Sequence, residues 1–456
     1  MKIIHFYNLI LNLITILYTN VIMFFMEANM NILLKNISYL DVINEKNVRN
    51  VNIHIQDNII KEIYSEDKKL FNFDYIIDCS NKLASPAFTN GHTHLGMTQM
   101  RNYADDLELM TWLNEKIFPV EARLTSEDIY YASLLSIVEN IKSGVGNVCD
   151  MYDRIDRVSD AIIESGIRGS ISMGLTSVSG DVNKKLDKLY SIYKEYNNQG
   201  SGRLKILPGP HAIYTCSKEF LKMVLDLSEK MDNRLNIHVS ETETEVNNCI
   251  KENGVRPIEY LNQIGFMDKK IIAAHCVHLN KEEIEFISDK EFYPIYNPTS
   301  NLKLASGFTD IDYMLKNKIK VGIGTDGSSS NNNQDMIEEM HIGSIVNKAV
   351  NSDPKSVKAI DVLRMATINA SEIFDVDNGE IKEGKLADIC MFDLDSISFT
   401  PQNNLISALV YSANRSDVTD LIVDGKFIMR NREVLSLDEE KIKYKVRELS
   451  EKLLNC

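Results

Sequence analysis

The sequence predicts an α/β protein, a (β/α)8 TIM barrel accompanied by a small β-sandwich formed from N- and C-terminal segments. Between residues 86 and 375, apolar strand-like runs alternate with helical stretches about eight times, the number of units in such a barrel. Short strands with polar turns precede and follow this middle part. Polar residues, several of them histidines, stand where the apolar runs end. These observations favour a barrel whose functional side chains gather at one end.

The chain of 456 residues divides into four predicted parts. Residues 1–29 are a hydrophobic extension, residues 30–85 and 376–435 form the composite sandwich, residues 86–375 form the barrel, and residues 436–456 form a charged C-terminal helix. A turn at Asp424-Gly425-Lys426 separates two short strands of the sandwich. The sandwich strands are expected at Ile32–Leu34, Val51–Gln56, Ile59–Tyr64, Tyr75–Asp78, Ala387–Asp393 and Leu421–Met429.

Each barrel strand is expected to be a short apolar run that ends in polar residues. These runs are Pro86–His94, Gly146–Tyr152, Ile167–Gly174, Leu204–His211, Leu235–Glu241, Ile271–His278, Phe292–Pro298 and Val321–Asp326. Helices are expected between them, as at Ser126–Lys142, Lys218–Lys230 and Ile311–Asn317.

The N-terminal residues 3–25 are almost uncharged and long enough to span a bilayer. No small-x-small cleavage site follows them, and their several asparagines weaken a membrane interpretation. We favour a true start of translation at Met26 or Met30, which predicts a cytoplasmic protein. The alternatives are a membrane anchor at residues 3–25 and ordinary structure.

Composition narrows the possible partners. The formal net charge of −15 disfavours nucleic acid, because phosphates would be repelled. The 7 cysteines are scattered without paired spacing, which fits a reducing compartment better than a disulfide framework. Hydrophobic residues make up 44% of the chain, enough for a sizeable core.

The pair His92-x-His94 is the strongest functional signal. Two histidines at i and i+2 of an extended segment point the same way, so both imidazoles can reach one metal ion. A His-x-His motif often occurs by chance, but several other histidines of this chain also lie at predicted strand ends. His5, His54 and His341 do not. Those at strand ends are His92, His94, His211, His238, His275 and, a little further along, His278.

Three imidazoles and one carboxylate, from His92, His94, His238 and Asp326, suit a single divalent ion such as zinc. Zinc lowers the pKa of bound water to about 7, which makes a nucleophile available at neutral pH. Asp326 could bind the metal and take the proton from the water. Alternatively, it is a turn aspartate that precedes Gly327.

Two further residues could assist catalysis. Glu241 lies three residues after His238 and could donate a proton to a ring nitrogen of a substrate. It could instead be a surface residue in the acidic run 241–245. His275 could polarise the water or a developing oxyanion.

These residues and their spacing resemble the amidohydrolase superfamily. The chain is most similar to the branch of 5-methylthioadenosine/S-adenosylhomocysteine deaminases and related ATZ/TRZ-type hydrolases, over about residues 31–435. The matching segments are Pro86–His94, Phe118–Thr125, Gly209–Ala212, His238–Glu241, Ala273–Leu279, Asn297–Leu304 and Gly324–Gly327.

The resemblance implies a hydrolase that replaces an exocyclic amine on a purine-like ring by oxygen and releases ammonia. It implies one zinc or similar ion, and no lysine-bridged pair of ions. Glu121 would bind the ribose hydroxyls, His211 would contact the nucleoside, and Glu241 and Asp326 would also contact the substrate. The expected partner is thus a small-molecule nucleoside, and a homo-oligomer is expected.

One departure from the family pattern concerns substrate choice. Relatives that deaminate S-adenosylhomocysteine hold its carboxylate with two arginines, and here these positions are Met173 and, in a poorly aligned loop, Lys185. Methionine cannot form the charged, bidentate fork that arginine forms with a carboxylate. We therefore expect a preference for methylthioadenosine or adenosine, unless another cation takes this role.

Two alternatives remain. A guanine or pterin deaminase, or a triazine chlorohydrolase, would share the metal chemistry, but Glu121 and His211 favour a nucleoside. A membrane-anchored, non-catalytic binder of metal or nucleoside would not need an acid such as Glu241 beside the metal.

Overall fold

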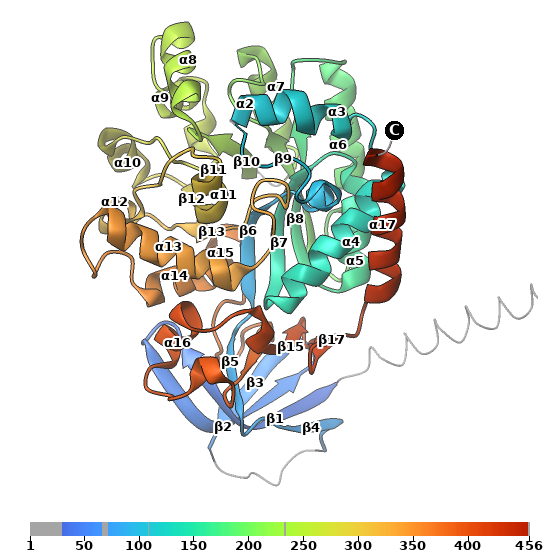
Figure 1. The fold of residues 1–456 in the computed structure, drawn as a ribbon, viewed down its shortest axis with the longest axis vertical. Coiled ribbons are helices and arrows are strands. Elements are labelled where there is room, and N and C mark those ends of the chain that lie inside the picture. The colour runs from blue at the N-terminus through green and yellow to red at the C-terminus, as the bar shows by residue number, and fades with distance from the viewer. Residues whose placement is uncertain (1–29, 66–71, 108, 232–233, 455–456) are drawn as a thin grey trace, which may run out of the picture.

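The computed structural model describes residues 30–65, 72–107, 109–231 and 234–454, whose arrangement is drawn in Figure 1. The N-terminal extension lies outside these residues, and with it the predicted anchor at residues 3–25. Among the described helices, none combines the length and the apolar character needed to cross a membrane.

Parallel strands in the middle of the chain form two hydrogen-bonded groups of four, in chain order. The two groups meet on both sides: the amide of His238 donates to the His211 carbonyl over 3.0 Å, and the amide of Asp326 donates to the His92 carbonyl over 2.9 Å. Every predicted barrel run overlaps one strand, in the arrangement of a (β/α)8 barrel. The strands are β6 (Phe88–Thr93), β7 (Val145–Tyr152), β8 (Arg168–Leu175), β9 (Leu204–Pro210), β10 (Arg234–Val239), β11 (Lys270–His275), β12 (Phe292–Tyr296) and β13 (Gly322–Ile323).

Helices follow each strand. The helix α4 begins where Thr125 and Asp128 form a reciprocal capping box, which satisfies amides that the helix leaves unpaired. The main helices are α4 (Ser126–Lys142), α5 (Ile155–Ser165), α6 (Val182–Tyr196), α7 (Lys218–Ser228), α8 (Glu243–Asn253), α9 (Pro257–Gln263), α10 (Lys281–Ile287), α11 (Pro298–Lys303), α12 (Ile311–Lys316), α13 (Met336–Val350), α14 (Ala359–Ala366), α15 (Ile368–Phe374) and α16 (Leu405–Tyr411).

The connection from β6 to α4 is long. It contains the short helical segments η1 (Leu95–Met100), α2 (Leu109–Thr111), η2 (Trp112–Ile117) and α3 (Phe118–Glu121). It therefore starts at the predicted metal-binding pair, and its last helical segment ends at Glu121.

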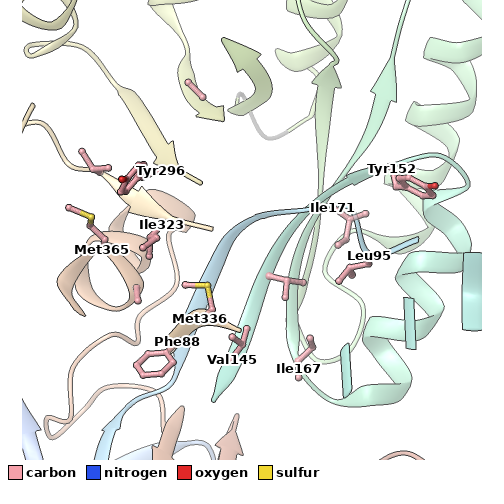
Figure 2. Packing of buried hydrophobic residues seen from close by; sticks show 14 of the residues in the cluster. Phe88, Leu95, Val145, Tyr152, Ile167, Ile171, Tyr296, Ile323, Met336 and Met365 are labelled. Carbon is pink, nitrogen blue, oxygen red and sulfur yellow. The ribbon is translucent and has the colours of Figure 1, made fainter. Parts of the chain in front are cut away.

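The barrel strands are deeply buried, and most of the side chains packed around them are apolar. Every residue of β7 and of β10 is buried, as expected for parallel strands that helices cover on the outside. Figure 2 shows part of this core, with Phe88 on β6, Val145 on β7 and Ile323 on β13.

Both ends of the chain build one β-domain, as predicted, and Figure 1 shows it below the barrel. The strand β5 pairs with β1 on one side and with β14 on the other, so hydrogen bonds join all of these strands in a nine-stranded sheet. The strands are β1 (Asn31–Asp41), β2 (Lys46–Gln56), β3 (Ile59–Tyr64), β4 (Tyr75–Asp78), β5 (Lys82–Pro86), β14 (Ile389–Asp393), β15 (Val418–Val423), β16 (Lys426–Arg430) and β17 (Glu433–Val434).

The predicted C-terminal helix is present as α17 (Glu439–Leu454). It packs along α4 on the outside of the barrel, as Figure 1 shows.

Candidate metal centre and active site

The four predicted metal ligands come together at the carboxyl ends of the barrel strands. Ring nitrogens of His92, His94 and His238 lie within 4.8 Å of one another. The Nε2 atoms of His94 and His238 are 3.4 Å apart. The Oδ1 atom of Asp326 lies 3.2 Å from Nε2 of His94 and 3.5 Å from Nε2 of His92.

Hydrogen bonds orient these ligands. The Nδ1 atom of His94 donates to the Met151 carbonyl over 2.5 Å, and that of His238 donates to the His211 carbonyl over 2.8 Å. A carbonyl can only accept, so Nδ1 carries a proton in both rings, and Nε2 is the nitrogen that faces the shared space.

Two serine hydroxyls fix the carboxylate of Asp326. Its Oδ2 atom accepts from Ser300 over 2.6 Å and from Ser330 over 3.0 Å, which leaves Oδ1 directed at the histidines. The backbone before Asp326 runs very close to that of His92, because a Cβ on Gly324 would lie only 2.5 Å from the backbone nitrogen of His92. Only glycine allows this approach of the last strand to the first.

Burial and charge set the protonation of the site. Burial lowers the pKa of His92 to about 4 and that of His238 well below its ordinary value, so both rings are neutral. Burial acts to lower the pKa of His94 as well, but its hydrogen bond to Asp326 and the charge of that carboxylate raise it to about 9. Burial acts to raise the pKa of Asp326, yet contacts with His92 and His94 hold it well below its usual range.

This donor set fits a divalent ion. Both ring nitrogens of His92 are buried without a hydrogen-bond partner among the described residues, and a buried polar atom without a partner is costly. Three imidazoles and one carboxylate match the ligand preference of zinc and similar metals. The described residues of this site could therefore hold one metal ion.

The residue His275 lies between the ligands and the predicted acid. Its Nδ1 atom donates to Oδ1 of Asn301 over 2.8 Å, while its Nε2 atom lies 3.8 Å from Oε2 of Glu241. Its ring nitrogen is also close enough to His92 and Asp326 to form a second possible metal-binding group.

The carboxyl group of Glu241 is buried, so the surface interpretation of the acidic run does not hold for it. Both carboxylate oxygens of Glu245 accept from backbone amides, those of Ser240 and Glu241, over 2.9 Å each. Burial raises the pKa of Glu241 and that of Glu245, the latter to about 7. Of the three glutamates in this run, Glu243 alone is exposed.

A cavity of about 420 Å³ leads to these groups. His94, His238, Glu241, His275 and Asp326 lie on its wall. The predicted substrate residues line it too: these are Glu121 and His211.

The carboxylate of Glu121 accepts a hydrogen bond from the Tyr152 hydroxyl over 2.8 Å, and burial raises its pKa. The Nδ1 atom of His211 is 3.0 Å from the Thr215 hydroxyl, and burial lowers the pKa of His211 to about 4. Apolar side chains, among them Trp112 and Phe118, complete the wall.

Three other residues that the sequence singled out do not join the cavity. His278 bonds through Nε2 to the Ser306 carbonyl over 2.7 Å. Met173 is buried but is not part of the cavity wall. The amine of Lys185 is bound to the carbonyls of Thr176 and Ser179, over 2.7 Å each.

Several residues of the site went unrecognised in the sequence. Asp150 accepts from the Leu95 amide over 2.6 Å and from the Thr93 hydroxyl over 2.8 Å, and so braces the chain around the histidine pair. Burial raises its pKa to about 6. An acidic residue inside an otherwise apolar strand could have revealed Asp150 from the sequence. No sequence feature indicated the positioning roles of Glu245 and Ser330.

The model of the Amidohydrolase family matches residues 83–428. The chain belongs to the amidohydrolase family. Its relatives include 5-methylthioadenosine/S-adenosylhomocysteine deaminases from Thermoanaerobacter pseudethanolicus (44% identity over 93% of this chain and 100% of the relative) and Dictyoglomus thermophilum (45% identity over 93% and 99%).

Among solved structures, this amidohydrolase resembles an adenosine deaminase from Xanthomonas campestris with bound zinc. The TM-score is 0.89 at 26% identity, and the match covers 94% of this chain and 99% of that one. The resemblance predicted from the sequence motifs is thereby confirmed.

Proposed function

We propose that this amidohydrolase is a metal-dependent deaminase of adenine nucleosides. It would convert 5′-methylthioadenosine, S-adenosylhomocysteine or adenosine to the inosine analogue plus ammonia. One observation carries the proposal: a single cavity joins a metal-ligand set and a buried acid to Glu121 and His211, which suit a nucleoside. The names of the relatives support the same substrates.

The ligands His92, His94, His238 and Asp326 would hold one divalent ion, and we propose zinc because the Xanthomonas deaminase contains it. Such an ion, when bound, polarises water and lowers its pKa.

The side chains around the ligands would move the protons. Asp326 accepts the proton that water loses as its oxygen attacks the ring carbon that carries the amine. Glu241 donates a proton to the neighbouring ring nitrogen, and the buried His275 lies within reach to polarise the oxygen. The carbon–nitrogen bond to the amine then breaks, and the proton held by Asp326 leaves with ammonia. The proton that remains on the attacking oxygen returns to Glu241, which restores the acid and leaves a carbonyl on the ring.

The other wall of the cavity would position the nucleoside. Glu121 is an acceptor for ribose hydroxyls, and the Tyr152 hydroxyl holds its carboxylate in place. His211 lies next to the ligand His238, so it can contact the substrate beside the reacting ring.

The test is ammonia release from methylthioadenosine, S-adenosylhomocysteine, adenosine and guanine, after chelation and after zinc is returned. We expect release from at least one nucleoside, its loss on chelation and its recovery with zinc. Ammonia from guanine alone, or chloride from a chlorotriazine, would assign another hydrolase activity. Binding of zinc and nucleoside without turnover would identify a non-catalytic binder.

A further inference from the structure

The cavity wall carries one positively charged residue that the proposed function leaves unused. Arg154 is the one lysine or arginine among the described residues that line the cavity. It lies two residues after the end of β7 and occupies the N-cap position of α5 in a left-handed backbone conformation, with φ of 46°. Its side chain is partly buried.

The guanidinium group of Arg154 has unused hydrogen-bonding capacity. Its Nη2 atom donates a hydrogen bond to the Leu124 carbonyl over 2.9 Å. The Nε atom is buried without a hydrogen-bond partner, and no ion pair links the group to a carboxylate of the described residues. Arg157, one turn further along, is paired with Asp160 over 2.6 Å. Because a desolvated N–H group without a partner is costly, the open donors of Arg154 indicate a site for an anion.

Arg154 lies on the side of the cavity where Glu121 would bind the ribose. Its partner Leu124 comes three residues after Glu121. Tyr152, which donates to Glu121, stands two residues before Arg154. A substituent on the ribose of a bound nucleoside would therefore approach Arg154, while the ring faces the metal ligands.

Other cations nearby are already engaged. The amine of Lys185 is held by two loop carbonyls, and that of Lys188 lies 3.9 Å from Asp153. The acidic residues Glu121 and Asp153 also line the cavity and would repel an anion. An anionic substituent thus has one favourable place to bind.

We propose that Arg154 binds the carboxylate of an amino-acid substituent on the ribose, which makes S-adenosylhomocysteine a favoured substrate. This inference rests on the proposed function and replaces the preference that Met173 suggested. The planar guanidinium presents paired N–H donors, so it can bind a carboxylate in a bidentate, charge-assisted manner. Methylthioadenosine has no carboxylate and gains nothing from this contact.

The experiment measures kcat/KM for S-adenosylhomocysteine and for methylthioadenosine, and compares their ratio between variants. We expect R154M to lower this ratio roughly 10- to 100-fold, the effect of losing a hydrogen-bonded charge pair. The matched control R157M removes an arginine from the same helix outside the cavity and leaves the ratio unchanged. R154K keeps the charge but loses the fork, so its ratio falls less; it also serves if R154M does not fold.

The outcomes separate the two proposals. A wild-type enzyme that deaminates none of S-adenosylhomocysteine, methylthioadenosine and adenosine overturns the proposed function. A wild-type enzyme that deaminates adenosine but not S-adenosylhomocysteine overturns only the assignment of Arg154. Wild-type activity with a ratio that stays the same in R154M and R154K overturns only the assignment of Arg154.

Discussion

The two ends of the barrel strands differ in whether their buried polar groups have partners. At the amino end of β8, the buried Arg168 binds Asp388 through Nε at 2.6 Å and Asp424 through Nη2 at 2.9 Å. At the carboxyl end of β6, both ring nitrogens of His92 are buried without a hydrogen-bond partner among the described residues. Both ends are buried, but only the first is saturated with partners.

The amino ends of the strands thus contribute to stability, whereas the carboxyl ends are available for function. The Arg168 cluster joins β8 to β14 and to the turn after β15, so it fastens the barrel to the terminal sheet. Its ion pairs also hold the pKa of Asp388 below its ordinary value, although burial acts to raise it. The opposite end keeps open donors and acceptors for ligands, which costs stability.

The largest expected effect is on catalysis at the carboxyl end. E241Q should lower kcat for deamination about 10²- to 10⁴-fold, because it removes the proton donor. The free energy of unfolding should not fall, since an amide is easier to bury than a carboxylate. Ammonia release measures kcat, and urea denaturation measures the free energy of unfolding. The control is E243Q, an exposed neighbour; an equal loss of activity there would contradict the assigned role.

At the amino end the expected effect is on stability. R168M leaves Asp388 buried without its cation and should lower the free energy of unfolding by about 3–5 kcal/mol. Urea denaturation measures this, with R157M as the control, because its partly exposed ion pair contributes at most about 1 kcal/mol. A loss at Arg168 no larger than at Arg157 would show that the two ends do not differ as described.

Metal should stabilise the carboxyl end. Zinc at about 100 times its Kd should raise the free energy of unfolding of the metal-free protein by about 2.7 kcal/mol. H238A should need far more zinc for the same gain, as thermal unfolding under a zinc titration would show. H278A, which changes a histidine that is bound to Ser306 instead, should respond as the wild type does. Equal responses of both variants would refute the ligand set.

The effect of pH on stability is the smallest when it is taken over one pH unit. Glu339, on α13, is buried and binds the Thr299 amide, and burial raises its pKa from 4.5 to about 8. The native state therefore keeps a proton that the unfolded chain releases. The resulting stability is complete below about pH 4.5 and is lost as pH rises through about 8, with a slope of at most about 1.4 kcal/mol per pH unit.

E339Q cannot titrate and should show a flatter dependence of unfolding free energy on pH between 5 and 8. The control is E338Q, an exposed neighbour on the same helix. If the curves of E339Q and wild type are parallel, the pKa of Glu339 is not raised.

The sequence by itself determined the fold class, because strand and helix periodicity are local properties that survive in eight successive units. It also predicted that the proposed ligands His92, His94, His238 and Asp326 meet, since they stand at the ends of apolar runs and parallel strands bring those ends together.

Only the tertiary structure decided which of several similar residues take part. His275 ends β11 and His278 lies three residues further on, yet His278 bonds to a loop carbonyl whereas His275 faces Glu241. Arg154 gained its place on the cavity wall because a helical connection brings Leu124 against it. Such contacts depend on the backbone paths of segments far apart in the chain, and no local pattern encodes them.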